Sequence, residues 1–243
     1  MLARPQLDFQ RTPVTLMLAA IALAIEVVCQ FDPARRDFFY NDLQLGIWWQ
    51  IWTGQLWRPV TTTLLHGGLL HAVFNIYWMT VFGPALEIDF GSARTAGLFV
   101  LLAYVSSLPQ YVISGYFDPH AGAMVGLSGV LYGFFGICWI GSRSRQIFAA
   151  VCDPMTVQIL VGWLILCVAV SALGRMSGTY LMSVANITHV SGLLFGYLYG
   201  KAIFAQRHRP LWVAVATIGT LVVLATLIAA PGNPGYEFAR QFR

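Results

Sequence analysis

Long apolar stretches, separated by short polar segments, run through almost the whole chain. Seven of them come close to, or reach, the about 20 residues that an α-helix needs to cross a bilayer. Their expected ranges are 12–30, 66–86, 94–113, 125–140, 154–173, 182–204 and 211–230. The pattern therefore predicts an all-α fold, a polytopic membrane helix bundle.

The fourth stretch is unusually short. Its 16 residues extend for only ~24 Å as a helix, against a hydrocarbon core of about 30 Å. We therefore expect this helix to begin or end inside the membrane. Irregular backbone at that depth is tolerated only where it is buried in protein or lines a cavity.

The composition agrees with a membrane protein. Of the 243 residues, 58% are hydrophobic and 10% are charged, whereas about a quarter of an ordinary soluble domain is charged. We expect residues 1–243 to form a single membrane domain in the lipid bilayer. The net charge of +4 includes no basic run, so we expect no nucleic-acid partner.

The four cysteines lack the spacing of metal ligands, and we interpret them as small packing residues with no metal site.

The arginines and lysine indicate the orientation of the bundle. Two arginines precede the first apolar stretch, no cleavage site follows it, and we read it as an uncleaved helix. The short connections 141–146 and 205–210 are basic, whereas 115–124 has no Lys or Arg. These features predict a multi-pass protein with a cytoplasmic N-terminus. Without an organelle transit peptide, a bacterial plasma (inner) membrane is the default. The tryptophan-rich loop 31–65 is expected in the outer interface.

Four polar residues are expected at a similar depth in the outer half of the membrane. His71 and Asn75 lie five and nine residues into the second stretch, Ser128 three into the fourth, and His189 seven into the sixth. These three stretches run in the same direction. Because polar groups in hydrocarbon are costly and face the bundle interior or a water-filled cavity, the matched depth suggests a site. Alone, Ser128 would be an ordinary helix serine bonded to its own backbone.

Glycines recur on the same two helices. Gly126, Gly129, Gly133 and Gly136 form a stripe on the fourth, and Gly192, Gly196 and Gly200 continue the face of His189 on the sixth. Small residues at these spacings let membrane helices approach closely. We expect this approach to bring Ser128 to His189; generic packing would explain the glycines but not the serine and histidine.

A serine becomes a good nucleophile when a base takes its proton, and His189 suits that role. No acidic residue fits a triad, because Glu87 lies at the cytoplasmic end and Glu26 has no motif around it. The sequence therefore predicts a Ser-His dyad. His66 is offset by about 140° from His71 on a helix, which argues against a shared metal and favours a loop or cap histidine.

These motifs, in their order, resemble the rhomboid family of intramembrane serine proteases over roughly residues 57–200. The resemblance is carried by Trp57-Arg58, His66, His71, Asn75, Glu87, Gly91, Gly126-Leu127-Ser128-Gly129, Tyr132, His189, Gly192 and Gly196.

The resemblance implies a role for each of these positions. Ser128 would be the nucleophile and His189 its base, and His71, Asn75 and the Ser128 amide would form the oxyanion hole. Tyr132 would stack on His189, and Phe74 and the fifth helix would flank substrate access, with Gly126 and Gly129 in support. A structural role would fall to Trp57, Arg58, Glu87, Gly192 and Gly196.

The implied protein is a serine endopeptidase without a cofactor. It would cleave single-span transmembrane proteins near the outer face, from a hydrated cavity open to the outside. The expected layout is a six-helix core, residues 12–204, followed by a seventh helix and an outer tail, residues 205–243. One alternative is an inactive rhomboid-like protein that binds and escorts transmembrane helices. Another is a small transporter, which the lack of acidic residues beside His71, Asn75 and His189 disfavours.

Overall fold

The structure is a computed structural model that describes residues 4–43, 49–117, 125–177, 185–230, 233, 236–237 and 240–241. Within these residues the regular structure is helical, with no strand. The long helices are α1 (Pro13–Phe31), α4 (Leu69–Phe90), α5 (Ser92–Phe117), α6 (Ser128–Gly141), α8 (Pro154–Ser177), α9 (Asn186–Phe204) and α10 (Arg209–Ala225).

Each of the seven apolar stretches corresponds to one long helix, which confirms the predicted all-α membrane bundle. By length and composition, α1, α4, α5 and α8 suffice to cross a membrane, whereas α6 and α10 are apolar but shorter. Helix α9 has 19 residues but is less apolar. Helix α6 has 14 residues and begins at Ser128, so residues 125–127 lie outside the helix that the sequence predicted for them.

Short helices fill the segment between α1 and α4. They are α2 (Ala34–Asp37), a π-helix (Phe38–Asp42), a 3₁₀ helix (Trp49–Thr53), α3 (Arg58–Thr61) and a second 3₁₀ helix (Thr62–Leu64). Trp52 is fully buried, and its indole N–H donates to the carbonyl of Thr226 just after α10, at 2.8 Å. The Trp52 ring packs inside the protein with Leu108 and Tyr111 of α5, while the interfacial position of the loop stays a prediction.

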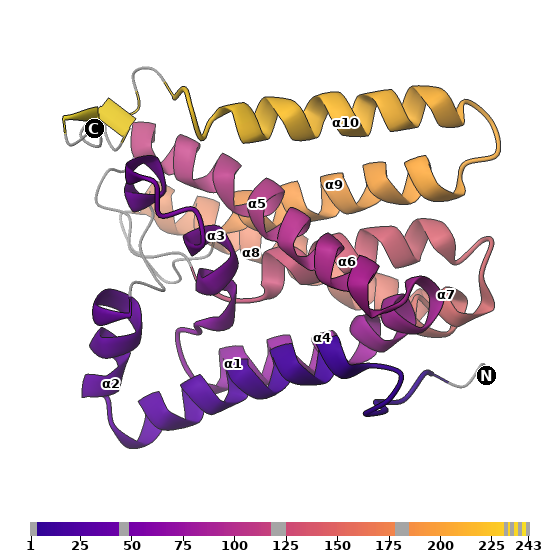
Figure 1. The fold of residues 1–243 in the computed structure, drawn as a ribbon, viewed down its shortest axis with the longest axis horizontal. Helices are drawn as coiled ribbons and strands as arrows, with labels where there is room; N and C mark the ends of the chain where they lie inside the picture. Colours follow the sequence, from indigo (N-terminus) through magenta and orange to yellow (C-terminus); the bar gives the residue numbers. More distant parts are fainter. Residues whose placement is uncertain are drawn as a thin grey trace.

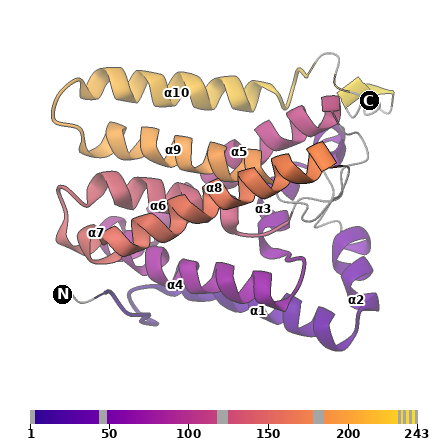
Figure 2. The ribbon, with the colours of Figure 1, turned by 180° about the vertical axis from the view of Figure 1, so that it is seen from behind.

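Among the long helices, α6 packs against α9, α4 and α5. Its closest neighbour is α9, which also packs against α5 and α10, while α1 packs against α4. Figure 1 shows α9 and α10 side by side along one edge of the bundle and α1 along the opposite edge. Helix α8 runs across the back (Figure 2). Only 17% of its apolar stretch is buried, against 56% for α4, so α8 is the most weakly held of these spans.

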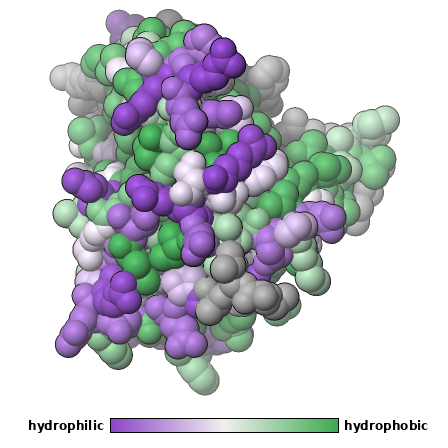
Figure 3. Space-filling model, turned by 90° about the vertical axis from the view of Figure 1, so that its right-hand side faces the viewer, coloured by the Kyte–Doolittle hydropathy of each residue, from purple (hydrophilic) through white to green (hydrophobic). Residues whose placement is uncertain are grey.

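One end of the bundle is polar. The N-terminus lies there, together with α7 (Gln146–Val151) and the α9–α10 connection (Figure 1). Figure 3 faces this end and shows hydrophilic residues spread across it. Exposed arginines occupy the two connections: Arg143 and Arg145 lie before α7, Arg207 lies before α10, and Arg209 is the first residue of α10.

Glycines allow the backbones of α6 and α9 to touch. A methyl group added at Gly192 would collide with the carbonyl oxygen of Gly129, and one added at Gly196 would collide with that of Gly133. A Cβ on Gly136 would lie 2.8 Å from the backbone nitrogen of Tyr197. Because backbone atoms cannot move aside as a side chain can, this interface needs glycine.

A buried carboxylate holds the start of α1. Glu87, near the end of α4, accepts the backbone N–H groups of Val14 at 2.8 Å and Thr15 at 2.9 Å, and the Thr15 hydroxyl at 2.7 Å. The first N–H groups of a helix have no partner within the helix, and a negative charge there also interacts favourably with the helix dipole. Glu87 thus joins α1 to α4 and lies in a structural position.

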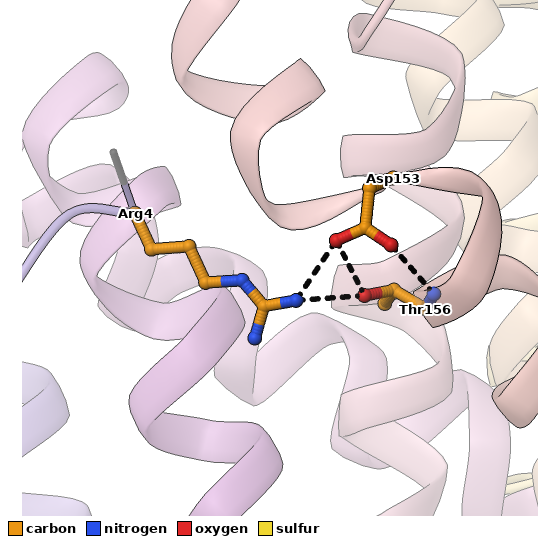
Figure 4. Close-up of polar contacts among 3 residues, drawn as sticks. All are labelled: Arg4, Asp153 and Thr156. Atoms are coloured by element: carbon orange, nitrogen blue, oxygen red, sulfur yellow. Dashed lines mark hydrogen bonds and ion pairs between the residues drawn. The ribbon is translucent and has the colours of Figure 1, made fainter. Parts of the chain in front are cut away.

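The N-terminal segment is tied to the start of α8 (Figure 4). The Arg4 guanidinium lies 2.9 Å from a carboxylate oxygen of Asp153 and donates to the Thr156 hydroxyl at 3.0 Å. Asp153 also accepts the backbone N–H of Thr156 at 2.9 Å. The pKa of the Asp153 carboxyl lies below its ordinary value. The main cause is the hydrogen bond from the Thr156 N–H, and the second is the bond from the Arg4 guanidinium.

Replacement of Gly192 by alanine should destabilise the bundle, because the new methyl group forces α6 and α9 apart. We expect the free energy of unfolding to fall by about 1–3 kcal/mol, the usual cost of overpacking. Unfolding in mixed micelles measures this effect. Gly162→Ala is the matched control, since no atom lies within 4 Å of its Cβ position, and it should be neutral or stabilise by up to about 1 kcal/mol. Equal stability of the two variants would contradict the close approach.

Arg4→Ala should raise the pKa of Asp153 toward its ordinary value, while the Thr156 N–H keeps it below that value. A carbon-13 NMR titration of the carboxyl measures the shift, with Arg11→Ala as a control from the same segment. Because the folded-state pKa is lowered, the stabilisation by this carboxylate is present above its ordinary pKa and is lost as the pH falls through the lowered value. An unchanged pKa in Arg4→Ala would refute the contact.

Candidate active site

Ser128 is the first residue of α6, and the chain reaches it through a tight bend at Gly126. Gly126 has φ +114°, a conformation that favours glycine. Its N–H donates to the carbonyl of Thr62 at 3.2 Å, which joins the start of α6 to the segment before α4. The bend leaves Ser128 partly exposed while Leu127 is fully buried.

Ser128 and His189 are in hydrogen-bond contact. The Ser128 hydroxyl oxygen lies 2.7 Å from Nε2 of His189, a distance at which the imidazole can take the hydroxyl proton. The two residues lie 61 positions apart, and the glycine contacts between α6 and α9 bring them together. His189 is buried, with 7% of its surface exposed.

Packing against Tyr132 orients the His189 ring. Tyr132 lies one turn after Ser128, and its ring centroid is 5.1 Å from that of His189 at an interplanar angle of 37°. The Tyr132 hydroxyl donates to the Leu160 carbonyl at 3.0 Å, which fixes the tyrosine against α8. Among the described residues, Nδ1 of His189 is buried without a hydrogen-bond partner. Within the part of the chain that the structure describes, His189 therefore contacts Ser128 through Nε2 and no further side chain through Nδ1.

His71 and Asn75 lie beside the bend that leads into α6. A Cβ on Gly126 would lie 2.9 Å from Nε2 of His71 and 3.7 Å from the Asn75 amide nitrogen. The N–H of Gly67 donates to Nδ1 of His71 at 3.4 Å. A neutral imidazole that accepts at Nδ1 carries its proton on Nε2, so His71 presents an N–H toward Gly126.

Asn75 adds a second side-chain donor. Its amide nitrogen donates one N–H to the His71 carbonyl at 2.9 Å, and an amide nitrogen has two. The backbone N–H groups at the start of α6 have no acceptor within their own helix. Donors from α4 therefore lie beside the bend at Gly126, two residues before the N–H groups at the start of α6.

Other residues predicted for the site lie around it. Phe74 contacts Trp163 of α8, with ring centroids 5.4 Å apart, and this contact closes the space between α4 and α8. Arg58 is buried and its Nε donates to Gln55 at 2.5 Å, whereas Trp57 is 46% exposed. Both lie in the segment before α4.

The structure corrects the position of the His66 ring relative to His71 that the sequence predicted. Its ring centroid lies 5.1 Å from that of His71, nearly perpendicular to it at 75°. The angular offset assumed a helix from residue 66, but α4 begins at Leu69, so His66 folds back on His71. Burial, and secondly the neighbouring His71, lower the pKa of His66 to about 3, so that its ring is neutral at pH 7. The described residues include no cluster of three potential metal ligands.

Sequence reasoning also missed the close packing of side chains from α5 and α9 around Gly129. A Cβ there would collide with the Thr188 methyl group and lie 2.7 Å from the Ser106 hydroxyl oxygen. Ser106 comes from α5, so a third helix takes part in seating α6. Its only sequence signal is a pair of serines within an apolar stretch.

Comparison with known proteins places this site in a family. The family model described as "Rhomboid domain" matches residues 53–206, a range that contains Ser128 and His189. The chain is similar to the Rhomboid protease GlpG of Haemophilus influenzae, with 28% identity over 194 residues that cover 79% of this chain and 91% of that relative.

Two longer relatives carry the same name. The Rhomboid protease GlpG of Serratia proteamaculans is 30% identical over 203 residues, 81% of this chain and 64% of the relative. That of Photorhabdus laumondii is 31% identical over 208 residues, 83% of this chain and 64% of the relative. The chain thus spans less than two thirds of these two relatives.

Proposed function

This chain belongs to the rhomboid family and is an intramembrane serine protease; from this premise we propose that Ser128 and His189 form its catalytic dyad. The observation that carries the proposal is the 2.7 Å contact between the Ser128 hydroxyl and Nε2 of His189. His189 takes the hydroxyl proton as Ser128 attacks the scissile carbonyl, and returns it to the leaving amine. A water molecule, activated by the same imidazole, then hydrolyses the acyl-enzyme.

The oxyanion of the tetrahedral intermediate needs hydrogen-bond donors that are already in place. Nε2–H of His71, the second amide N–H of Asn75 and the backbone N–H of Ser128 supply them in this proposal. Supporting geometry comes from Gly126, whose missing side chain lets His71 and Asn75 approach the start of α6. The positive end of the α6 dipole favours the same negative charge.

The proposed substrates are single-span transmembrane proteins. A peptide bond within a helix is shielded by its own hydrogen bonds, so a substrate has to unwind at the site. Access between α4 and α8 is supported by the low burial of α8. The Phe74–Trp163 contact would have to open for a substrate to pass.

The proposed orientation places the polar end of Figure 3 in the cytoplasm. Its exposed arginines favour the cytoplasmic side of a bacterial inner membrane. The site, toward the other end of α4 and α9, then lies near the outer face. Residues 1–243 would act as one membrane domain, in which α10 packs on α9 and Trp52 bonds to the chain after α10.

Ser128→Ala should abolish cleavage of a model transmembrane substrate by the purified protein. Loss of a nucleophile that acts together with its base lowers the rate by about 10⁴-fold or more. A serine-directed fluorophosphonate should label the wild type and not the variant. The matched control is Ser142→Ala, because Ser142 follows α6 and its hydroxyl donates to the carbonyl of Trp139.

Two results would contradict this assignment. Equal cleavage by wild type and Ser128→Ala would exclude Ser128 as the nucleophile, as would labelling that persists in the variant. A wild type that binds transmembrane helices but cleaves none of a broad panel would favour the alternative, a protein that escorts them.

Asn75→Ala should lower kcat by about 10²–10³-fold, the usual effect of losing one oxyanion donor. The KM should change little, because the interaction forms in the transition state. Thr80→Val on the same helix is the control, since its hydroxyl bonds to the Tyr77 carbonyl. A change confined to KM would show that Asn75 binds substrate and does not stabilise the oxyanion.

A further inference from the structure

Glu26 is a buried acid that the dyad does not use. It lies on α1, only 1% of its surface is exposed, and the sequence around it contains no motif. A carboxylate taken out of water is costly unless it is paired. Its partner is Arg36 of α2, whose Nη2 lies 3.2 Å from a carboxylate oxygen.

Arg36 also donates a second hydrogen bond, to the turn before α4. Its other terminal nitrogen, Nη1, donates to the carbonyl of His66 at 2.5 Å, and the Tyr40 hydroxyl donates to the same carbonyl at 3.4 Å. A guanidinium has a planar, rigid fork of donors, so Arg36 holds α1 and the turn before α4 in one fixed geometry.

That turn contacts His71 in two ways. The His66 ring packs on the His71 ring, with centroids 5.1 Å apart, and the next residue, Gly67, donates its N–H to Nδ1 of His71 at 3.4 Å. The Gly67 bond selects the tautomer of His71 that carries a proton on Nε2. The position of the His66–Gly67 turn therefore decides whether His71 presents an N–H donor to the site.

We propose that Glu26 and Arg36 are positioning residues for the oxyanion donor His71. Glu26 orients the guanidinium, Arg36 fixes the His66 carbonyl, and the turn then holds the His71 ring through Gly67. This inference rests on the proposed role of His71. It also explains why a costly charge is buried on α1, on the side of the site opposite α9.

A double-mutant cycle with His71 tests the proposal. Arg36→Ala should lower kcat for a transmembrane substrate by about 10–100-fold, the effect of a small misplacement of a catalytic group, with KM unchanged. In a His71→Ala background the same substitution should have no further effect, because its target is gone. Glu26→Gln should behave like a milder Arg36→Ala.

Neighbouring residues supply the controls. Arg35→Ala should leave kcat within about twofold, because Arg35 is exposed and pairs with Asp32. Arg36→Lys keeps the charge beside Glu26 but lacks the fork, so it should restore thermal stability more fully than kcat. This difference separates positioning from a general loss of folding.

Several results would overturn the proposal. One is an equal loss of kcat when Arg36→Ala is made in the wild type and in His71→Ala. The others are an Arg36→Ala variant that changes only KM, or one that leaves kcat unchanged. Failure of the proposed function is distinguishable, because cleavage would then persist in Ser128→Ala whatever residue occupies position 36.

Discussion

The close approach of α6 and α9 is the constraint on which the rest of the structure depends. Because Gly129 and Gly192 meet backbone to backbone, the Ser128 hydroxyl reaches His189 without a connecting residue. A larger side chain at Gly192 would collide with the backbone of Gly129 and force the two helices apart. The same contact seats Tyr132 on the His189 ring, so one packing interface places the proposed nucleophile, the proposed base and the ring that orients this base.

A second group of contacts acts on the other side of Ser128. The segment between α1 and α4 is bonded to the start of α6 through the Thr62 carbonyl and contacts His71 through His66 and Gly67. The Glu26–Arg36 ion pair stabilises this segment, whereas glycine packing stabilises the contact between α6 and α9. Catalysis in lipid thus combines a close apolar interface with a small polar network, because unpaired polar groups are costly there.

The helices differ in how firmly they are held. Helix α1 is fixed at its start by Glu87 and α10 is bonded to Trp52, whereas α8 is held at its start by Asp153 and Arg4 (Figure 4) and along its length by few buried residues. This weak packing of α8 next to Phe74 is the feature that supports the proposed passage of a substrate between α4 and α8. Firm packing elsewhere holds Ser128 and His189 in contact.

Local patterns in the sequence determined the seven helices and the glycine stripes, because apolar length and helical spacing are properties of neighbouring residues. The matched depth of Ser128 and His189 predicted their contact, and the packing of α6 on α9 brings it about. The tertiary structure alone decided the start of α6 at Ser128, the burial of Trp52, the stacking of His66 on His71, and the link from Glu26 to His66 through Arg36. These features join residues from separate segments through irregular turns. The hydrophobic periodicity of the sequence cannot predict such contacts, because they depend on the path of the backbone between the helices.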